Sequence, residues 1–203
     1  MHTKATDASR QTSPLAFFRG FLRNPDQVGS IIPSSRFLEK RIVTAAMQNT
    51  PRTLVELGPG TGGTTRALLK AMPTNGRLLA IELDPHFVSM LRKIDDPRLT
   101  VHHGSATDVC ELLRDYGWGD ADAVISGIPF SSMPDVLGRQ IMSAVWDCLS
   151  PEGCFVAYQF RNRVITLGRE LIGSPEVEVE LLNVPPMRVC RWSKADSTPR
   201  RAG

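Results

Sequence analysis

The sequence lacks long uninterrupted runs of apolar residues and has few aromatic ones. Of its 203 residues, 41% are hydrophobic but only 6% are aromatic. No stretch approaches the ~18 uncharged apolar residues that a membrane-spanning helix requires. The N-terminal residues, MHTKATDASRQTSP, also lack the apolar core of a secretory signal peptide. We therefore expect no membrane-spanning segment and a cytoplasmic location.

Cysteine and histidine are also scarce, with four of each. The cysteines form no C-x-x-C pair, and no group of cysteine and histidine has the spacing of metal ligands. The sequence therefore predicts no metal site and no disulfide framework. We expect the cysteines to be reduced and mostly buried.

The net charge of +3 is small, but the charges are unevenly distributed along the chain. Residues 1–52 contain eight Lys or Arg and three Asp or Glu, which gives a net charge of +5. Residues 53–160 contain eight and thirteen, a net of −5, and residues 161–203 contain eight and five, a net of +3. Basic ends of this kind either contact an anionic surface, of nucleic acid or lipid, or are simply solvated.

Short β-rich runs alternate with helical stretches over most of the chain. Strands are predicted at 53–57, 77–83, 99–102, 121–126 and 154–160, with helices at 62–72, 85–94, 107–115 and 135–149. This alternation is typical of parallel strands joined by crossover helices. Two last runs, 177–184 and 187–192, are expected to pair as an antiparallel hairpin. The predicted fold is therefore α/β, a Rossmann-like, doubly wound, seven-stranded and mostly parallel sheet with an antiparallel C-terminal hairpin.

Two helices are predicted before the sheet. Residues 15–24 place apolar side chains on one side of a helix and Arg19 and Arg23 on the other, the apolar ones being Leu15, Phe17, Phe18, Phe21 and Leu22. Such an amphipathic helix can lie at a bilayer interface or pack on the core. The second helix, at 34–48, begins at a serine cap and carries Phe37, Leu38 and Ile42 inward to cover the sheet.

A glycine-rich turn follows the first predicted strand. In LVELGPGTGG, Gly58, Gly60 and Gly63 match the pattern G-x-G-x-x-G, and Glu82 stands at the end of the second strand. Glycines let a ligand approach the backbone closely, and a carboxylate at this place can accept hydrogen bonds from both ribose hydroxyls. The pattern suits a dinucleotide or S-adenosylmethionine; the alternative without a ligand is a plain tight turn.

Three features favour S-adenosylmethionine over a dinucleotide. Glu56 stands just before the turn, where a carboxylate can face the ammonium group of a ligand. Pro59 lies inside the turn, and residues suited to hydride transfer are not evident. We therefore predict S-adenosylmethionine as the cofactor, with S-adenosylhomocysteine as its product.

The ordered motifs E-L-G-P-G-T-G (56–62), I-E-L-D (81–84), G-S-A (104–106) and S-G-I-P-F (126–130) resemble those of class I S-adenosylmethionine-dependent methyltransferases. N-P-D-Q-V-G-S-I-I-P-S-S (24–35) together with S-G-I-P-F-S-S-M-P (126–134) resembles bacterial phospholipid N-methyltransferases of the phosphatidylethanolamine type. Those enzymes are also similar to the rRNA adenine dimethyltransferases. The resemblance covers about residues 15–192. It implies methylation of phosphatidylethanolamine towards phosphatidylcholine by a monomer bound peripherally at the inner face of the membrane.

The resemblance implies roles on the donor side. Residues lining the methionine part of the donor would be Glu56, Gly58, Gly60 and Thr61; Glu82 would hold the ribose, and Leu83 and Ala106 the adenine faces. Ser105 replaces an Asp that often holds the adenine amino group, so Asp108 or a backbone group is expected to take over.

The resemblance also implies a lid over the donor, formed by Ser30, Ile31 and Pro33. The expected organisation is then a basic tail, amphipathic helix and lid loop at 1–33, a methyltransferase domain at 34–192 and a polar tail at 193–203.

On the acceptor side, Phe130 and Tyr158 fall at the carboxyl ends of predicted strands, where this fold places acceptors. Their aromatic faces suit the cation that repeated methylation of an amine produces. Ser126 can accept a hydrogen bond from the attacking amine but is a poor base, so the general base is unassigned. His102 and His103 lie near the adenine side and are not expected to be catalytic.

The S-G-I-P-F loop separates two acceptor classes. The related adenine N6-methyltransferases use N/D/S-(P/L/I)-P-(Y/F/W), in which the aromatic ring stacks on the base, and here one additional residue interrupts that spacing. The chain also ends near residue 203, which leaves no room for the RNA-binding domain expected of rRNA dimethylases. We therefore expect a phospholipid and no nucleic acid as partner. The residues expected to contact an anionic membrane are Phe17, Phe18, Arg19, Phe21, Leu22 and Arg23.

Two alternatives remain open. One is an adenine N6-methyltransferase acting on rRNA or another nucleic acid. The other is a module that binds S-adenosylmethionine or NAD without turnover.

Overall fold

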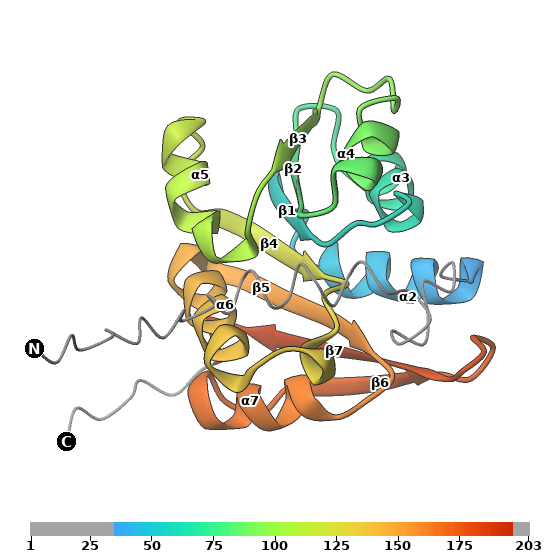
Figure 1. Ribbon diagram of the computed structural model, residues 1–203, viewed down its shortest axis with the longest axis vertical. Coiled ribbons are helices and arrows are strands. Elements are labelled where there is room, and N and C mark those ends of the chain that lie inside the picture. Colours follow the sequence, from blue (N-terminus) through green and yellow to red (C-terminus); the bar gives the residue numbers. More distant parts are fainter. Residues whose placement is uncertain (1–34, 197–203) are drawn as a thin grey trace, which may run out of the picture.

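A single sheet forms the centre of the fold. The computed structural model describes residues 35–196, so the predicted helix at 15–24 and the predicted lid lie outside the described residues. Seven strands lie in the order β3-β2-β1-β4-β5-β7-β6 (Figure 1). Their bounds are β1 Thr53–Leu57, β2 Arg77–Glu82, β3 Leu99–His103, β4 Ala121–Ser126, β5 Leu149–Gln159, β6 Glu176–Glu180 and β7 Met187–Ser193.

The strand pairing confirms the predicted fold class. The strands from β3 to β5 in this order pair in parallel, whereas β7 is antiparallel to both β5 and β6. The sheet is therefore Rossmann-like, mostly parallel and closed at one edge by an antiparallel hairpin. Beyond β7, the backbone N–H of Lys194 still donates to the Gly153 carbonyl at 2.9 Å.

Helices cover both faces of the sheet (Figure 1). One face carries α2 Arg36–Ala46, α3 Gly63–Ala71 and α4 Pro85–Leu91, and the other carries α5 Val109–Asp115, α6 Asp135–Cys148 and α7 Arg163–Leu171. Two 3₁₀ turns, η1 Ala106–Asp108 and η2 Phe130–Ser132, follow β3 and β4. Between residues 35 and 196, no helix combines the length and apolar character needed to cross a bilayer.

Buried apolar side chains fill the space between the helices and the sheet. β1 is buried along its whole length, as expected for a central strand covered on both faces. The core beneath α5, α6 and α7 contains Phe155 and Trp192, whose rings stack with their centroids 5.3 Å apart. A second core lies beneath α2 and α3.

Helix α2 begins at the predicted serine cap. The Ser35 hydroxyl accepts a hydrogen bond from the backbone N–H of Leu38 at 3.2 Å, which satisfies one of the free donors of the first turn. Leu38 and Ile42 are buried as predicted. Phe37 was predicted to face inward but is 39% exposed, because it lies outside the buried stripe of the helix, and the guanidinium carbon of Arg36 lies 4.9 Å from its ring centre.

Helix α7 was not predicted from the sequence. Its buried side follows a helical spacing through Val164, Ile165, Leu167 and Gly168, but a glycine inside a short helix weakens that signal. The glycine is required by packing, because a Cβ at Gly168 would lie 2.7 Å from Cε2 of Trp192. The helix is therefore specified by a contact with a strand that comes 24 residues later in the chain.

We predict that Gly168→Ala lowers the free energy of unfolding by about 1–3 kcal/mol, because overlap with the Trp192 ring outweighs the higher helix propensity of alanine. Thr166→Ala, at an exposed position of the same helix, is the matched control. Denaturant unfolding of both variants measures the difference. Equal stability of the two variants would contradict the packing argument.

Candidate functional site

The candidate site lies where the order of the strands reverses. Strand β1 lies between β2 on one side and β4 on the other, and the chain order of the strands runs in opposite directions from it. In such sheets, ligands bind outside the carboxyl ends of the strands at this point. Leu57 and Ser126 are paired at these ends. The loops that follow are joined to the sheet, because Gly127 N–H donates to the Leu57 carbonyl at 2.9 Å and Gly58 N–H to the Ile81 carbonyl at 3.0 Å.

The glycine-rich turn uses glycines for their backbone conformation. Gly58, Gly60 and Gly62 have φ values of +67°, +57° and +82°, which other residues rarely adopt. Gly62, rather than Gly63 of the predicted pattern, is the left-handed residue that begins α3. Among the described residues, no atom lies within 4 Å of the position that a Cβ at Gly60 would occupy, so the turn leaves open space above this residue.

Glu82 connects this turn to the end of β2. Its Oε2 accepts the N–H of Gly60 at 3.0 Å, and its Oε1 accepts the N–H groups of Leu83 and Asp84 at 2.7 and 2.9 Å. Burial raises the pKa of this carboxyl, and the hydrogen bonds from the backbone oppose the rise. A carboxylate has about four acceptor positions. One position on Oε2 therefore stays open for a ribose hydroxyl.

Glu56 is the most deeply buried carboxyl of the site, with no exposed surface. Its Oε2 accepts a hydrogen bond from the Thr65 hydroxyl at 2.6 Å, but within residues 35–196 its Oε1 has no partner. Burial raises the pKa of Glu56 to about 8, with a smaller contribution from the negative charge of Glu82. A buried, unpartnered carboxyl oxygen is costly, and a ligand ammonium would satisfy it.

Tyr158 brings a hydroxyl to the same place from the end of β5. A Cβ at Gly127 would overlap the Tyr158 hydroxyl and would lie 2.9 Å from Tyr158 Cζ and 3.0 Å from the Gly58 carbonyl oxygen. Burial and the charge of Glu56 raise the pKa of the Tyr158 hydroxyl, while a hydrogen bond with Thr64 opposes the rise. The hydroxyl therefore stays neutral. The residue that lengthens the S-G-I-P-F loop is thus the one that makes room for Tyr158.

Ser126 and Phe130, the other two predicted acceptor residues, make their contacts within the protein. Ser126 is fully buried, and its hydroxyl accepts the N–H of Ile128 at 3.3 Å. The Phe130 side chain is 1% exposed and packs in the core beneath α6 and α7. The Gln159 side chain donates to the Ile128 carbonyl and fixes the same loop. A direct contact of Ser126 with an acceptor stays a prediction. The Phe130 ring, at 1% exposed, has almost no free face for the predicted contact with a cation.

The predicted adenine side follows β2 and β3. Leu83 is half-buried and packs against the core next to β3, and Ala106 is buried at the start of η1. Ser105 caps η1, where its hydroxyl accepts from the N–H of Thr107 and is hydrogen-bonded to the Thr107 hydroxyl. Asp108 is exposed and accepts from the same Thr107 hydroxyl. Recognition of the adenine amino group by Asp108 stays a prediction.

Sequence reasoning missed several polar residues of the site. The Thr65 hydroxyl donates to Glu56. The sequence pattern that could have indicated this residue is the pair of threonines directly after the glycine-rich turn. Gln159 is buried and follows Tyr158 at the end of β5. A glutamine at the end of an otherwise apolar strand could have indicated a polar contact at the site. Glu39 comes from α2, and a Cβ at Gly63 would lie 2.7 Å from its Oε1. Only the packing of α2 on α3 reveals this proximity.

The residues present fit S-adenosylmethionine. The unpartnered oxygen of Glu56 suits the donor's ammonium group, the space above Gly60 admits a ligand against the backbone, and Glu82 keeps an acceptor for a ribose hydroxyl. The predicted contacts of Ser30 and Ile31 lie outside the described residues. Among residues 35–196, no group of His, Cys, Asp and Glu is arranged to hold a metal ion, and the absence of a metal cofactor stays a prediction.

A comparison with solved structures finds the same fold in known methyltransferases. The 1,6-didemethyltoxoflavin-N1-methyltransferase of Burkholderia thailandensis, solved with its substrate and S-adenosylhomocysteine, superposes with a TM-score of 0.66. The match covers 96% of this chain and 94% of that one at 12% identity. The chain thus has the fold of a class I S-adenosylmethionine-dependent methyltransferase, with its candidate site at the switch point of the sheet.

Sequence comparisons identify the family. The sequence model of the family described as "Ribosomal RNA adenine dimethylase" matches residues 21–157. The chain belongs to this family, and S-adenosylmethionine is its methyl donor.

Two curated relatives differ in the acceptor that their names give. The ornithine lipid N-methyltransferase of Singulisphaera acidiphila is 31% identical over 141 residues, which cover 68% of this chain and 73% of the relative. The ribosomal RNA small subunit methyltransferase A of Thiobacillus denitrificans is 38% identical over 92 residues, 44% of this chain. That match spans only 33% of the rRNA methyltransferase.

We predict that donor-site affinity rises with pH up to about 8, because the carboxyl of Glu56 must lose a proton when an ammonium binds beside it. Below the pKa of free Glu56, the association constant of S-adenosylhomocysteine should fall by up to about tenfold per pH unit. Calorimetry between pH 6 and 8.5 measures this slope. Glu56→Gln should bind more weakly and without the slope, whereas the same slope in both proteins would exclude Glu56 as its source.

We also predict that Gly127→Ala weakens S-adenosylhomocysteine binding by about tenfold, because its methyl group displaces Tyr158 and presses on the Gly58 carbonyl. Adding Tyr158→Phe removes the overlapping hydroxyl. The double variant should therefore lose less affinity than the sum of the two single losses. Strictly additive losses, measured by calorimetry on the four proteins, would show that the two residues act independently.

Proposed function

We propose that the protein transfers methyl groups from S-adenosylmethionine to the amine headgroup of a membrane phospholipid, phosphatidylethanolamine, in the direction of phosphatidylcholine. The relative named for N-methylation of ornithine lipid supports an amine lipid as acceptor, because the match covers 73% of its length. Phosphatidylethanolamine and ornithine lipid share a primary amine held near a bilayer surface. The same donor geometry therefore serves either headgroup.

The observation that carries the proposal is the position of Phe130. In adenine N6-methyltransferases, the aromatic ring of the corresponding motif stacks on the extruded base. Here the ring of Phe130 is 1% exposed and lies in the core beneath α6 and α7, so it presents no face to a base. The additional residue Gly127 admits the neutral hydroxyl of Tyr158 beside the donor turn instead.

The charge of the site also supports an amine acceptor. Glu39, Glu56 and Glu82 lie around the glycine-rich turn, and the guanidinium of Arg66 donates to the Thr61 and Gly62 carbonyls of the same turn. Carboxyl groups therefore outnumber the basic groups in contact with this turn. Carboxyl groups attract a cationic headgroup and repel the phosphates of a nucleic acid. A site of this charge favours a substrate that enters as an ammonium and reacts as an amine.

The protein's part in the reaction is positioning. Bound S-adenosylmethionine supplies the electrophilic methyl group. Glu56 holds the amino acid part of the donor and Glu82 holds its ribose. Tyr158 is then free to form a hydrogen bond with the acceptor amine. Holding a neutral amine in line with the methyl group provides most of the rate enhancement available to such a site. The group that removes the amine proton stays unassigned.

Membrane association belongs to the same proposal. We expect the amphipathic helix at 15–24 to lie at the interface of an anionic bilayer, with its apolar side chains in the acyl region and its arginines near the headgroups. The enzyme would then act as a peripheral protein and a monomer.

A second candidate is an adenine N6-methyltransferase acting on rRNA. The family model and the rRNA methyltransferase relative favour it. It requires a base to reach the donor without stacking on Phe130, since that ring is buried.

The proposal is tested with the full chain, labelled S-adenosylmethionine and three acceptors in parallel: vesicles containing phosphatidylethanolamine, vesicles containing ornithine lipid, and rRNA. We expect mono-, di- and trimethylated phosphatidylethanolamine by mass spectrometry. Glu82→Ala removes one hydrogen bond to the donor turn and two to the residues that follow β2, and it should reduce this product by at least about 100-fold.

Two results would decide against it. Label in adenine of the rRNA with none in lipid would establish the second candidate. Label in ornithine lipid alone would retain the reaction class and change the headgroup.

A further inference from the structure

The tip of the β6–β7 hairpin, residues 181–186, exposes large aliphatic side chains. Leu181 is 72% exposed, Leu182 64% and Val184 81%, the three largest values among the exposed hydrophobic residues between 35 and 196. Val177 and Val179 continue the apolar surface along β6, at 42% and 44%. Scattered exposed aliphatic residues are ordinary, but a contiguous group on one protruding loop marks an interaction surface.

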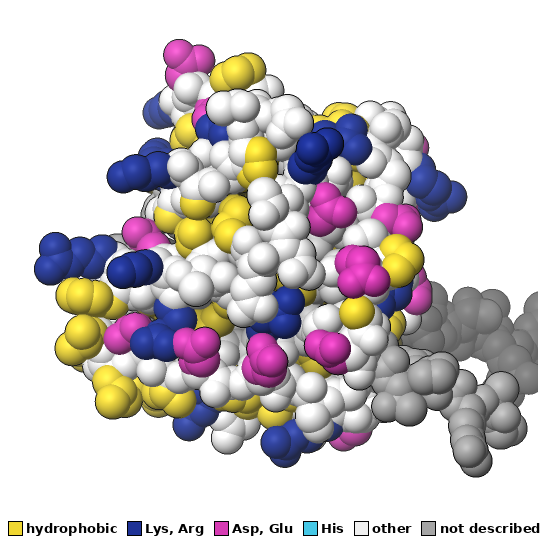
Figure 2. All heavy atoms as spheres, turned by 180° about the vertical axis from the view of Figure 1, so that it is seen from behind, with side chains coloured by type: hydrophobic (Ala, Val, Ile, Leu, Met, Phe, Trp, Pro, Cys, Tyr) yellow, Lys and Arg dark blue, Asp and Glu magenta, His cyan; other side chains and the backbone are white. Residues whose placement is uncertain are grey.

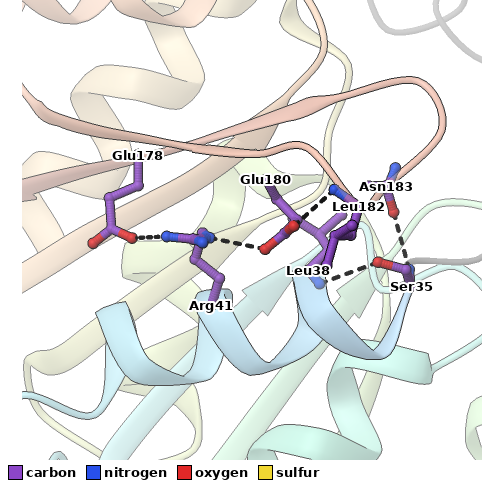
Figure 3. Close-up of polar contacts among 7 residues, drawn as sticks. All are labelled: Ser35, Leu38, Arg41, Glu178, Glu180, Leu182 and Asn183. Atoms are coloured by element: carbon purple, nitrogen blue, oxygen red, sulfur yellow. Dashed lines mark hydrogen bonds and ion pairs between the residues drawn. The ribbon is translucent and has the colours of Figure 1, made fainter.

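Two polar residues at the tip of the same hairpin face the protein. Asn183 is 4% exposed and Glu180 6%. Asn183 Oδ1 accepts the N–H of Ser35 at 3.0 Å, and its Nδ2 donates to the Pro185 carbonyl at 2.9 Å. Glu180 Oε1 accepts the N–H of Leu182 at 2.9 Å (Figure 3). This is the reverse of an ordinary surface turn, in which the polar side chains face water.

Ionic contacts with α2 hold the tip in place. Arg41 donates from Nε to Glu180 Oε2 at 3.1 Å and from Nη1 to Glu178 (Figure 3). Together with the Ser35–Asn183 bond, they attach the hairpin to the first two turns of α2. A tip fixed in this way presents its aliphatic side chains without the loss of chain entropy that a free loop would incur on binding.

The tip lies at the same end of the sheet as the donor site, where the parallel strands have their carboxyl ends. Glu180 pairs with Met187, and Gln159 pairs with Arg188, so the carboxyl end of β5 and the hairpin tip lie at the same end of the sheet. Tyr158 and Ser126 lie at this end of the sheet as well. Phe160, 50% exposed and directly after β5, adds an aromatic ring there.

Basic side chains accompany these apolar residues. Arg36 and Lys40 are exposed on α2 beside the Ser35–Asn183 bond, and Arg161 follows Phe160. Arg188 donates to the Phe160 carbonyl at 2.8 Å. The nearby carboxyls of Glu178 and Glu180 are paired with Arg41. Figure 2 shows hydrophobic side chains at the end of the molecule where the hairpin lies, with Lys and Arg as well as Asp and Glu beside them.

We propose that the hairpin tip inserts into the headgroup–acyl boundary of an anionic bilayer and positions the donor site at headgroup level. This proposal rests on the proposed lipid acceptor. A bilayer is the occupant that the observations favour, because a few aliphatic side chains on a narrow tip can enter acyl chains, and basic neighbours match anionic headgroups. A stable protein interface requires about 800 Å² per partner with a flatter, well-packed surface.

The first experiment measures insertion directly. Leu182→Trp places a fluorophore at the tip of the full chain, and its emission is compared with that of the unsubstituted protein, which contains three Trp residues. With vesicles of phosphatidylethanolamine and phosphatidylglycerol, we expect an additional blue-shifted emission that brominated acyl chains quench. An unshifted and unquenched tip fluorophore, with vesicles sedimenting the protein, would overturn the proposal.

The second experiment measures the contribution to binding. Leu181→Asp/Leu182→Asp should lower partition onto these vesicles by at least about tenfold, both in the full chain and with Phe18→Asp/Phe21→Asp present to remove the predicted helix face. Tyr116→Asp is the control and should leave partition unchanged, because Tyr116 is 40% exposed and contacts His102 of β3, the outermost strand on the side of the sheet away from β6. Thermal unfolding and S-adenosylhomocysteine affinity check that each variant is folded.

Activity separates this proposal from the proposed function. The hairpin variant should lose methylation of vesicle lipid but keep methylation of a short-chain, monomeric phosphatidylethanolamine. Unchanged vesicle methylation would overturn the hairpin proposal while leaving the function intact. Absence of lipid methylation in all proteins, with tip insertion still observed, would refute the function and not the surface. Self-association abolished by the variant, without vesicle insertion, would assign the tip to a second copy and overturn the proposal.

Discussion

The hydrogen bonds accepted by Glu82 are the constraint on which the donor site depends. One carboxylate at the end of β2 fixes Gly60 in the turn after β1 and the first two residues that follow its own strand. Because both loops leave adjacent parallel strands, this single group sets their separation and hence the width available to a ligand. The left-handed glycines then keep the turn free of side chains where the ligand approaches. The cost of burying Glu82 is offset by these bonds, and the remaining acceptor is left for the ligand.

Glu56 has the opposite arrangement, and the contrast explains the division of labour in the site. Its carboxyl is more deeply buried than that of Glu82 and receives one hydrogen bond within residues 35–196, and burial raises its pKa to about 8. A group of this kind is poorly satisfied until a cation arrives, whereas Glu82 is largely satisfied beforehand. The first provides a charge that responds to the ligand, and the second provides a rigid frame.

Much of the fold and the donor side could be predicted from the sequence, because both depend on local patterns. The strand–helix alternation, the glycine turn, Glu56 and Glu82 are each encoded by neighbouring residues. Helix α7 was not predicted because Gly168 is required by its packing against Trp192, which belongs to a strand distant in the sequence. The predicted strand to residue 184 ends at Glu180, because the Glu180 side chain accepts the N–H of Leu182 and the Asn183 side chain donates to the Pro185 carbonyl, so these backbone groups are not free for a ladder. The burial of Phe130, the contact of Tyr158 with Gly127 and the approach of Glu39 to α3 also depend on tertiary packing, which spacing does not encode.

Helix α2 begins at the residue bonded to Asn183 of the hairpin, and one turn later it brings Glu39 to the start of α3. Four residues of helix correspond to a rise of about 6 Å. The hairpin and the donor turn are therefore separated by a short rigid spacer rather than by a linker whose length fluctuates. With the hairpin in a bilayer, the depth at which the methyl group is offered would be a fixed dimension of the protein, and lipids would be selected by how far their amine stands from the acyl boundary.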